Sequence, residues 1–328
     1  LDERRKRAFS AHDLEAWEFD VLAALRRSGA PHRLSPGQLL RETHVTSGTM
    51  TNQIALKVHT QPLDEVICDR LSHIYQSEVA GYAFHSGIGV NLLDGENGIL
   101  GVEKIATAIK PEADWLPKSR LVSLENTCNI GGGSYYTLEK VRPIRQLCSE
   151  KKLGLHLDGA RLFNALAETN ESTEDWGKTF DSISICLSKG LGAPVGSLLI
   201  GGKDFIKDAR RLRKVMGGGM RQAGILAGAG IFALENNVAR LKIDHDHAQQ
   251  LAATLAFVPM VEKIRPVQTN IVFFDLKPSM PGAVFLEKLR SKGILGTTFG
   301  PQTIRFVTHL DVSESEIRQV CQVLKEMS

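Results

Sequence analysis

The sequence lacks a long hydrophobic run, paired cysteines and a large net charge. No apolar stretch reaches the ~18 residues that a membrane span needs, and the charged residues 1–7 are not followed by the apolar segment of a secretory signal. We therefore expect no membrane association and a cytoplasmic location. Five dispersed cysteines without a CxxC pair predict neither a zinc ribbon nor a disulfide scaffold, and we expect no metal site.

The charge balance is almost even. Lys and Arg together number 40 against 37 for Asp and Glu, which gives a formal net charge of +3. This balance is unlike that of a nucleic-acid-binding protein. The 42% hydrophobic and 23% charged residues are typical of a globular protein. A length of 328 residues predicts about two domains. We place an atypical basic segment at 1–44, a large domain at 45–230 and a small C-terminal domain at 231–328.

The large domain alternates short Val-, Ile- and Leu-rich runs with helical stretches. The runs predict strands at 65–68, 120–124, 153–157, 182–187 and 195–200. The stretches between them predict helices at 50–59, 77–83, 102–109, 138–152 and 205–216. This order predicts an α/β fold with a mostly parallel sheet flanked by helices. Ligands of such sheets bind beyond the carboxyl ends of the strands, so polar residues there are the first candidates for a site.

The C-terminal part mixes strands and helices in a different order. One long helical stretch, 222–255, is predicted to lead into it. Beyond that stretch we expect a strand at 269–276, a helix at 282–292, paired strands at 294–299 and 303–308, and a last helix at 313–327. Together these elements predict a small α+β domain.

Lys189 is the strongest candidate for chemistry. It follows the predicted strand 182–187 at once and is flanked by glycines. A lysine at the end of a buried strand is partly desolvated, which lowers its pKa and frees the amine to form a Schiff base. The alternative is a lysine that extends from the sheet edge into solvent.

Asp158 ends the strand before that of Lys189, so the two side chains are expected at the same edge of the sheet. A pyridoxal 5′-phosphate (PLP) site needs this pair, because the lysine carries the aldehyde carbon and the carboxylate keeps the pyridine nitrogen protonated. The alternative is that Asp158 only caps the following helix.

Other residues are candidates for binding anions. Gly48 and Thr49 stand at the start of the predicted helix 50–59, where free N–H groups favour a phosphate. Ser188 is a further phosphate donor. Arg221 follows three glycines, and Arg305 lies in the predicted strand 303–308, where it either pairs structurally or binds a carboxylate.

Three histidines allow different interpretations. His73 lies beyond the first predicted strand, on the ligand side of the sheet, where it can stack on a flat ring or act as a base. His245 and His247 lie on one helix, but positions two apart face away from each other. We therefore expect them on an exposed helix face, not in a metal site.

Six segments of this chain resemble motifs of the low-specificity L-threonine aldolases, and the resemblance runs from about residue 45 to the C-terminus. These segments are HLDGARLFNA (156–165), SKGLGAPVGS (188–197), SGT (47–49), LENT (124–127), GGGMRQ (217–222) and RFVTHLD (305–311). The resemblance implies the aspartate-aminotransferase-like fold, fold type I, with PLP as cofactor. It also implies cleavage of L-threonine or L-allo-threonine to glycine and acetaldehyde, in a homotetramer built as a dimer of dimers.

The resemblance also implies a role for each matching residue. Lys189 would form the Schiff base and Asp158 would bind the pyridine nitrogen, with Arg161 at the ring hydroxyl and near the substrate. His73 would stack on the ring. The phosphate would be held by Gly48 and Thr49, with Arg221 supplied by the partner subunit. Arg305 would bind the substrate carboxylate.

Two features depart from the family pattern. Cys128 stands where many members have a histidine that handles the β-hydroxyl group, and a thiol is a poorer base. Proton removal would then fall to His73. The family's N-terminal arm has no counterpart in residues 1–44. Two alternatives therefore stay open beside the aldolase: a PLP-dependent β-eliminating lyase, and an inactive PLP-binding subunit. A dinucleotide-binding enzyme fits poorly, since no GxGxxG follows the first strand.

Overall fold

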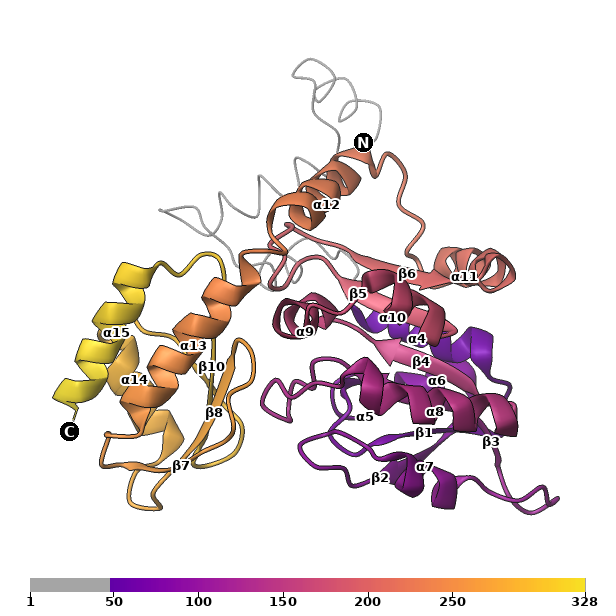
Figure 1. Cartoon of the computed structure of the whole chain (residues 1–328), viewed down its shortest axis with the longest axis horizontal. Helices are drawn as coiled ribbons and strands as arrows, with labels where there is room; N and C mark the ends of the chain where they lie inside the picture. The colour runs from indigo at the N-terminus through magenta and orange to yellow at the C-terminus, as the bar shows by residue number, and fades with distance from the viewer. Residues whose placement is uncertain (1–47, 328) are drawn as a thin grey trace, which may run out of the picture.

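A computed structural model describes residues 48–327, which form two bodies joined by a helix (Figure 1). The predicted segment 1–44 lies outside the described residues. Within the described part of the chain, no helix is long and apolar enough to span a membrane.

The large body is built on a six-stranded sheet in the order β2-β1-β3-β4-β5-β6. All neighbours pair in parallel except β5 and β6, which are antiparallel. The α/β class and the mostly parallel sheet are thus confirmed. The strands are β1 (Asp64–Asp69), β2 (Gly89–Leu93), β3 (Lys118–Glu125), β4 (Gly154–Asp158), β5 (Ser182–Cys186) and β6 (Ser197–Gly201).

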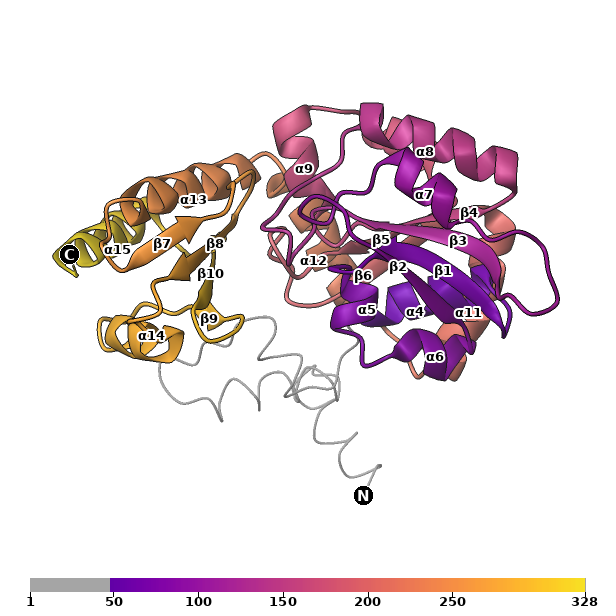
Figure 2. The ribbon, with the colours of Figure 1, turned by 90° about the horizontal axis from the view of Figure 1, so that it is seen from below.

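Helices cover both faces of this sheet. Helices α7, α8 and α9 lie on one face, and α4, α6 and α11 lie on the other (Figure 2). Their bounds are α4 (Gly48–His59), α5 (His73–Gln76), α6 (Gly81–Ser86), α7 (Val102–Ala108), α8 (Leu138–Lys151), α9 (Leu162–Thr169), α10 (Thr173–Thr179) and α11 (Lys203–Val215).

The single helix predicted at 77–83 is wrong. Val79 and Ala80 both have a φ of 54°, in the left-handed region that ends a right-handed helix. The chain therefore forms two short helices, α5 and α6, on either side of this turn. Strand β2 was missed because its sequence, GVNLL, lies at the sheet edge and is not a continuous apolar run.

The long helix predicted at 222–255 is interrupted. It forms α12 (Gly224–Asn236) and α13 (Leu241–Leu255), and the chain turns between them. Helix α12 is apolar from Gly224 to Leu234, whereas α13 buries one side against both bodies of the molecule.

The small body is an antiparallel sheet in the order β7-β8-β10-β9, packed against helices. Strands β9 and β10 pair as predicted, although β9 has only two residues. Figure 1 shows this body beside the large one. Its elements are β7 (Val261–Ile264), β8 (Ile271–Leu276), α14 (Gly282–Arg290), β9 (Thr297–Thr298), β10 (Thr303–Val307) and α15 (Glu314–Glu326).

Each body has its own hydrophobic core. Trp176 and the strand residues of β3, β4 and β5 fill the core of the large body, which extends to Ala233 and Leu241. The second core starts at Ala248 and contains Phe274 and Phe285. The predicted domain boundary after residue 230 stays a prediction, because α13 contributes side chains to both cores.

We predicted that His245 and His247 lie on an exposed helix face, and this prediction is wrong. Both side chains are buried. His245 Nδ1 contacts the carboxylate of Glu168, and its Nε2 lies 3.0 Å from Asn164 Nδ2. Helix α13 packs on α9 at this point, so the side that carries His245 is covered. Helical periodicity gives the relative direction of side chains but not which direction another element covers.

Ser313 caps the N-terminus of the last helix, α15, and forms a capping box with Glu316. Its hydroxyl accepts from the Glu316 backbone N–H, and the Glu316 carboxylate accepts from the Ser313 backbone N–H at 2.7 Å. Because the Glu316 backbone N–H would lose its acceptor, we expect Ser313→Ala to lower the free energy of unfolding by about 1 kcal/mol. Chemical denaturation measures this, with Ser291→Ala as a control at a helix end without such a box. Equal stability of the two variants would contradict the prediction.

Candidate active site

The carboxyl ends of the parallel strands meet at one edge of the large sheet. Asp158 ends β4, and β4 pairs with β5 so that Asp158 lies opposite Ser184. Lys189 lies three residues beyond the end of β5. The two predicted residues therefore lie at the ends of neighbouring strands. The charges of both act on the ring of His73, and the charge of Asp158 acts on Lys189.

Lys189 lies in a largely desolvated position. Burial lowers the pKa of its ammonium group, and the guanidinium of Arg161 lowers it further. The nearby negative charges of Asp158 and Glu125 oppose this effect but do not cancel it. A lysine whose pKa is lowered in this way supplies more of the neutral amine that acts as a nucleophile.

Arg161 stands next to this lysine. It is the residue that precedes α9, and its backbone N–H donates to the carbonyl of Asn126 at 3.3 Å. Burial lowers the pKa of its guanidinium, although Glu125 and Asp158 lie near enough to raise it. The site thus concentrates two cations and two carboxyl groups in a poorly solvated space.

Asp158 accepts two hydrogen bonds. Asn52 Nδ2 donates to Oδ2 at 2.8 Å, and the backbone N–H of Ala160 donates to Oδ1 at 3.1 Å. Each oxygen has a second lone pair that can accept from a ligand. The orientation of the carboxylate is therefore fixed by α4 on one side and by the start of the next loop on the other.

His73 begins α5 at the same edge. Its Nδ1 lies 2.9 Å from Glu78 Oε1, and its backbone N–H donates to Glu125 Oε2 at 2.8 Å. Burial alone would lower the pKa of the ring, but the hydrogen bond to Glu78 and the charge of Asp158 outweigh it and leave the pKa raised. His73 is thus held in place, and its surroundings raise its affinity for a proton.

One atom each of His73, Glu78 and Asp158 lies within 4.8 Å of the others, a spacing that a metal ion can bridge. However, Asn52 Nδ2 donates to both carboxylates of this group, at 2.8 and 2.9 Å. A cation there would face an N–H group that is itself a donor. The chemistry of these atoms is therefore that of a hydrogen-bond network.

Arg305 reaches the site from the small body. Its Nη1 donates to Asn129 Oδ1 at 2.7 Å, and its guanidinium carbon lies 4.7 Å from the centroid of the Phe299 ring. Burial, with a contribution from the charge of Arg161, lowers the pKa of Arg305 to about 10. Its Nε is buried and has no hydrogen-bond partner among the described residues. Two guanidinium groups near each other favour an anion between them.

The N-terminus of α4 is the predicted phosphate position. Thr51 Oγ1 lies 2.5 Å from Ser184 Oγ, which ties this helix end to β5. A Cβ at Gly48 would lie 3.8 Å from Ser197 Oγ, a buried hydroxyl with no partner in the described part of the chain. Thr49 stands beside Gly48 on this end, and Ser188 Oγ lies 3.4 Å from Cys186 Sγ.

Cys128 lies inside the protein. Its side chain is 0% exposed, and burial raises the pKa of the thiol well above its ordinary value. A Cβ at Gly98 would come within 2.2 Å of its Sγ, so the segment around Gly98 covers the thiol. Burial therefore disfavours the thiolate, and a catalytic role of Cys128 stays a prediction.

No hydrogen bond joins Arg221 to these groups in the described part of the chain. Arg221 is exposed, in the segment between α11 and α12. Its neighbour Met220 lines a cavity of about 370 Å³, together with Met50 of α4 and Arg213 of α11. The structure therefore leaves the phosphate-binding role of Arg221 as a prediction.

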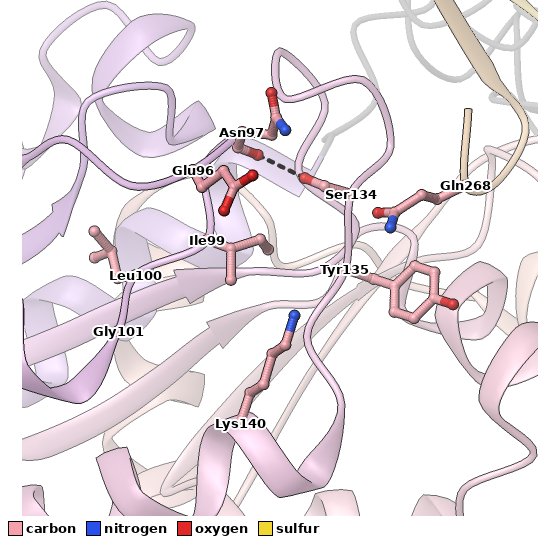
Figure 3. Close-up of a pocket in the computed structure, with 9 residues that line it drawn as sticks. All are labelled: Glu96, Asn97, Ile99, Leu100, Gly101, Ser134, Tyr135, Lys140 and Gln268. Carbon is pink, nitrogen blue, oxygen red and sulfur yellow. Dashed lines mark hydrogen bonds between the residues drawn. The ribbon is translucent and has the colours of Figure 1, made fainter. Parts of the chain in front are cut away.

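A second cavity, of about 470 Å³, lies between the segment 96–101 and the start of α8 (Figure 3). Lys140 points into it from α8, and Ser134 donates a hydrogen bond to the carbonyl of Asn97 on its wall. None of the residues around this cavity was predicted as a site residue. It is separate from the Lys189 and Asp158 side chains.

Glu125, Glu78 and Asn52 were not predicted as site residues. Glu125 ends β3 at the same edge as Asp158, so the rule that found Asp158 also applied to it. Glu78 and Asn52 gave no such signal, because they lie on or between helices and reach the site only through packing.

A mostly parallel sheet with a desolvated lysine beside a carboxylate at its carboxyl edge defines an α/β enzyme of PLP fold type I. The chain belongs to the β-eliminating lyase family, whose model matches residues 38–279.

The most similar characterised proteins include threonine aldolases. The low specificity L-threonine aldolase of Escherichia coli (strain K12) is 39% identical over 275 residues, which are 84% of this chain and 80% of that protein. The probable low-specificity L-threonine aldolase 2 of Arabidopsis thaliana is 37% identical over 291 residues, 86% of this chain and 82% of that protein. The solved structure of Leishmania major threonine aldolase matches with a TM-score of 0.76 at 26% identity, covering 86% of this chain and 83% of that chain.

Glu125 is expected to make stability depend on pH. Burial, followed by the charge of Asp158, raises the pKa of its carboxyl from 4.5 to about 7, against the effect of two backbone N–H groups that donate to it. A raised pKa means that the folded state favours the protonated form. The resulting stabilisation is present below pH 4.5 and is lost as the pH rises through 7.

We therefore expect wild type to lose stability relative to Glu125→Gln between pH 4.5 and 7.5, by at most about 3 kcal/mol. Chemical denaturation of both proteins across this range gives the difference in slope. The slope is the readout because Gln also loses one backbone hydrogen bond, which shifts the whole curve. Parallel curves would contradict the raised pKa.

Proposed function

We propose that this chain is a PLP-dependent aldehyde-lyase that cleaves L-threonine and L-allo-threonine to glycine and acetaldehyde. The observation that carries the proposal is the desolvated Lys189 beside Asp158, with Arg305 close to the same edge. The identity of 39% to the E. coli low specificity L-threonine aldolase supports the choice of reaction. The proposed role in the cell is threonine catabolism and glycine formation.

The residues present fit PLP. Asp158 offers free lone pairs to a protonated pyridine nitrogen, and Lys189 offers an amine of lowered pKa to an aldehyde. Gly48 and Thr49 offer backbone N–H groups at the start of α4, and the partnerless Ser197 Oγ lies beside them. These groups suit a phosphate. Ser188, which precedes Lys189 in the sequence, is proposed as a further donor to it.

In the proposed mechanism, PLP supplies an electron sink for the bond that breaks between Cα and Cβ. Lys189 would hold the cofactor, and Asp158 would keep its pyridine nitrogen protonated. Arg305 binds the substrate carboxylate, and Arg161 adds positive charge at the ring hydroxyl. These contacts would hold the substrate at the edge of the sheet that also carries His73.

His73 is the proposed base for the β-hydroxyl proton. Its Nδ1 is engaged with Glu78, so its Nε2 is the nitrogen that would take the proton. The buried, protonated thiol of Cys128 is not suited to this step. Glu78 stabilises the protonated ring until the proton is returned.

We further propose that the chain acts as a homo-oligomer, a dimer of dimers, in the cytoplasm. Helix α12 exposes the apolar side chains of Ile225, Ile231 and Phe232, the last at 61%. Apolar surface of this kind is typical of a subunit interface. Arg221 precedes α12 and would act in the site of the partner subunit.

Lys189→Ala tests the catalytic amine. We expect turnover of threonine to fall about 10³-fold or more and the absorbance of the PLP–lysine complex to disappear, because no other amine of the site can replace it. Lys207→Ala, which removes an exposed lysine of α11, is the control. Aldolase turnover retained by Lys189→Ala would refute the mechanism.

The products distinguish this reaction from the alternatives. Acetaldehyde and glycine in equal amounts support the aldolase. Pyruvate or another 2-oxo acid with ammonia from a β-substituted amino acid would indicate a β-eliminating lyase. A protein that binds PLP and releases neither set of products would be an inactive subunit.

Arg305→Ala tests substrate binding. We expect the KM for L-threonine to rise about 10- to 100-fold, with a smaller change in kcat, because the guanidinium binds a carboxylate that does not change during the reaction. Steady-state kinetics measure this split. Asn129→Ala is a useful companion, since it removes the Nη1 partner but leaves the charge. An unchanged KM in Arg305→Ala would count against the role.

A further inference from the structure

A chain of polar side chains runs from Asp158 along the contact between α4 and the sheet, and it ends at the last residue of α4. It begins at Asn52 on α4, whose Nδ2 lies 2.8 Å from Asp158 Oδ2 and 2.9 Å from Glu78 Oε1. Carboxylate oxygens only accept, so the amide nitrogen must face them and use both of its protons there. The amide oxygen of Asn52 therefore points away from the two carboxylates, and it can only accept.

The next member of the chain is His156 on β4. Its Nε2 lies 3.2 Å from Asn52 Oδ1. Because this oxygen only accepts, Nε2 must carry the ring proton; otherwise two acceptors would face each other without a proton between them. Burial, reinforced by the charge of His59, lowers the pKa of His156 to about 3, so the ring has a single proton at neutral pH. Its Nδ1 is then an acceptor.

Ser182 and His59 complete the chain. Ser182 Oγ lies 2.8 Å from His156 Nδ1 and 2.7 Å from His59 Nε2. The single hydroxyl proton of Ser182 goes to His156 Nδ1, which has none, so the hydroxyl oxygen must accept from His59 Nε2. Burial lowers the pKa of His59 to about 4, which leaves this ring neutral with its one proton on Nε2.

We infer that Asn52, His156, Ser182 and His59 form a one-way hydrogen-bond chain in which every proton points toward Asp158, and that Asn52 and His156 are positioning residues for the PLP-binding carboxylate. The inference rests on the proposed function only in naming PLP as the ligand of Asp158. Asn52 touches Asp158 directly, and His156 acts on it through Asn52.

The direction of the chain gives it an effect on the site. If Asn52 turned its amide, its oxygen would face two carboxylates, and His156 Nε2–H would lose its acceptor. The proton of His156 thus prevents the amide from turning. A fixed amide in turn keeps one donor on Asp158 Oδ2 and leaves the other lone pairs of that carboxylate for the pyridine nitrogen.

The direction can be tested in the protein without PLP. Nitrogen-15 NMR of the histidine side chains reports which ring nitrogen carries the proton. We expect a neutral His156 protonated on Nε2 and a neutral His59 protonated on Nε2. A proton on His156 Nδ1 would overturn the one-way chain, whatever reaction the enzyme catalyses.

The positioning role is tested by the affinity for PLP, measured by absorbance titration. Asn52→Leu and His156→Leu should each weaken PLP binding, the first by about 10-fold or more, since a hydrogen bond to a charged group is lost. His156→Gln keeps an N–H at the position of Nε2 and should restore most of the loss. Thermal denaturation identifies any variant that binds poorly because it is unfolded.

Gln53→Leu is the matched control. Gln53 is the next residue on α4 and donates to Glu78 Oε2 at 2.6 Å, and no hydrogen bond joins it to Asp158. The PLP affinity of the Gln53→Leu variant should stay within about 3-fold of that of wild type. Equal PLP affinity of wild type, Asn52→Leu and His156→Leu would overturn the positioning role.

The two proposals fail in different ways. If wild type binds PLP but releases no acetaldehyde from threonine, the proposed function fails, and the variants still test the chain. If wild type cleaves threonine while the Asn52 and His156 variants keep full PLP affinity, the chain has no positioning role and the proposed function stands.

Discussion

The desolvation of charged groups at the carboxyl edge of the six-stranded sheet is the constraint on which the site depends. Lys189 and Arg161 are both cations in this space, and burial lowers the pKa of each. Glu125 and Asp158 provide the opposite charge, but burial also raises the pKa of Glu125. Such a group of charges is costly to bury, so its retention in a core is typical of a functional site.

Polar side chains beneath this edge hold the charged groups in position. The carboxylate of Glu78 forms hydrogen bonds with His73 and with Asn52. The amide of Asn52 also donates to Asp158, which connects all four side chains. Buried networks of this kind specify one arrangement, because a side chain that turns leaves a donor or an acceptor without a partner. The small body adds Arg305 from β10, so the site needs both bodies in their observed relation.

Much of the fold was predictable because it depends on local patterns. Apolar runs gave five of the six strands of the large sheet, and the carboxyl-end rule gave Asp158 and Lys189. The helix predicted at 77–83 failed because two residues with positive φ interrupt it, which apolar spacing does not reveal. The burial of His245 was missed for a different reason: it is covered by α9, which is far away in sequence.

The sequence by itself determined the α/β class, the family motifs and the chemical identity of the lysine–carboxylate pair, because strand order and residue type are written along the chain. Only the tertiary structure decided that Glu125 has a raised pKa, that Cys128 is sealed from solvent and that Asn52 reaches Asp158. Desolvation and hydrogen-bond direction depend on which distant segments pack together. They are therefore properties of the folded chain and cannot be read from any one segment of it.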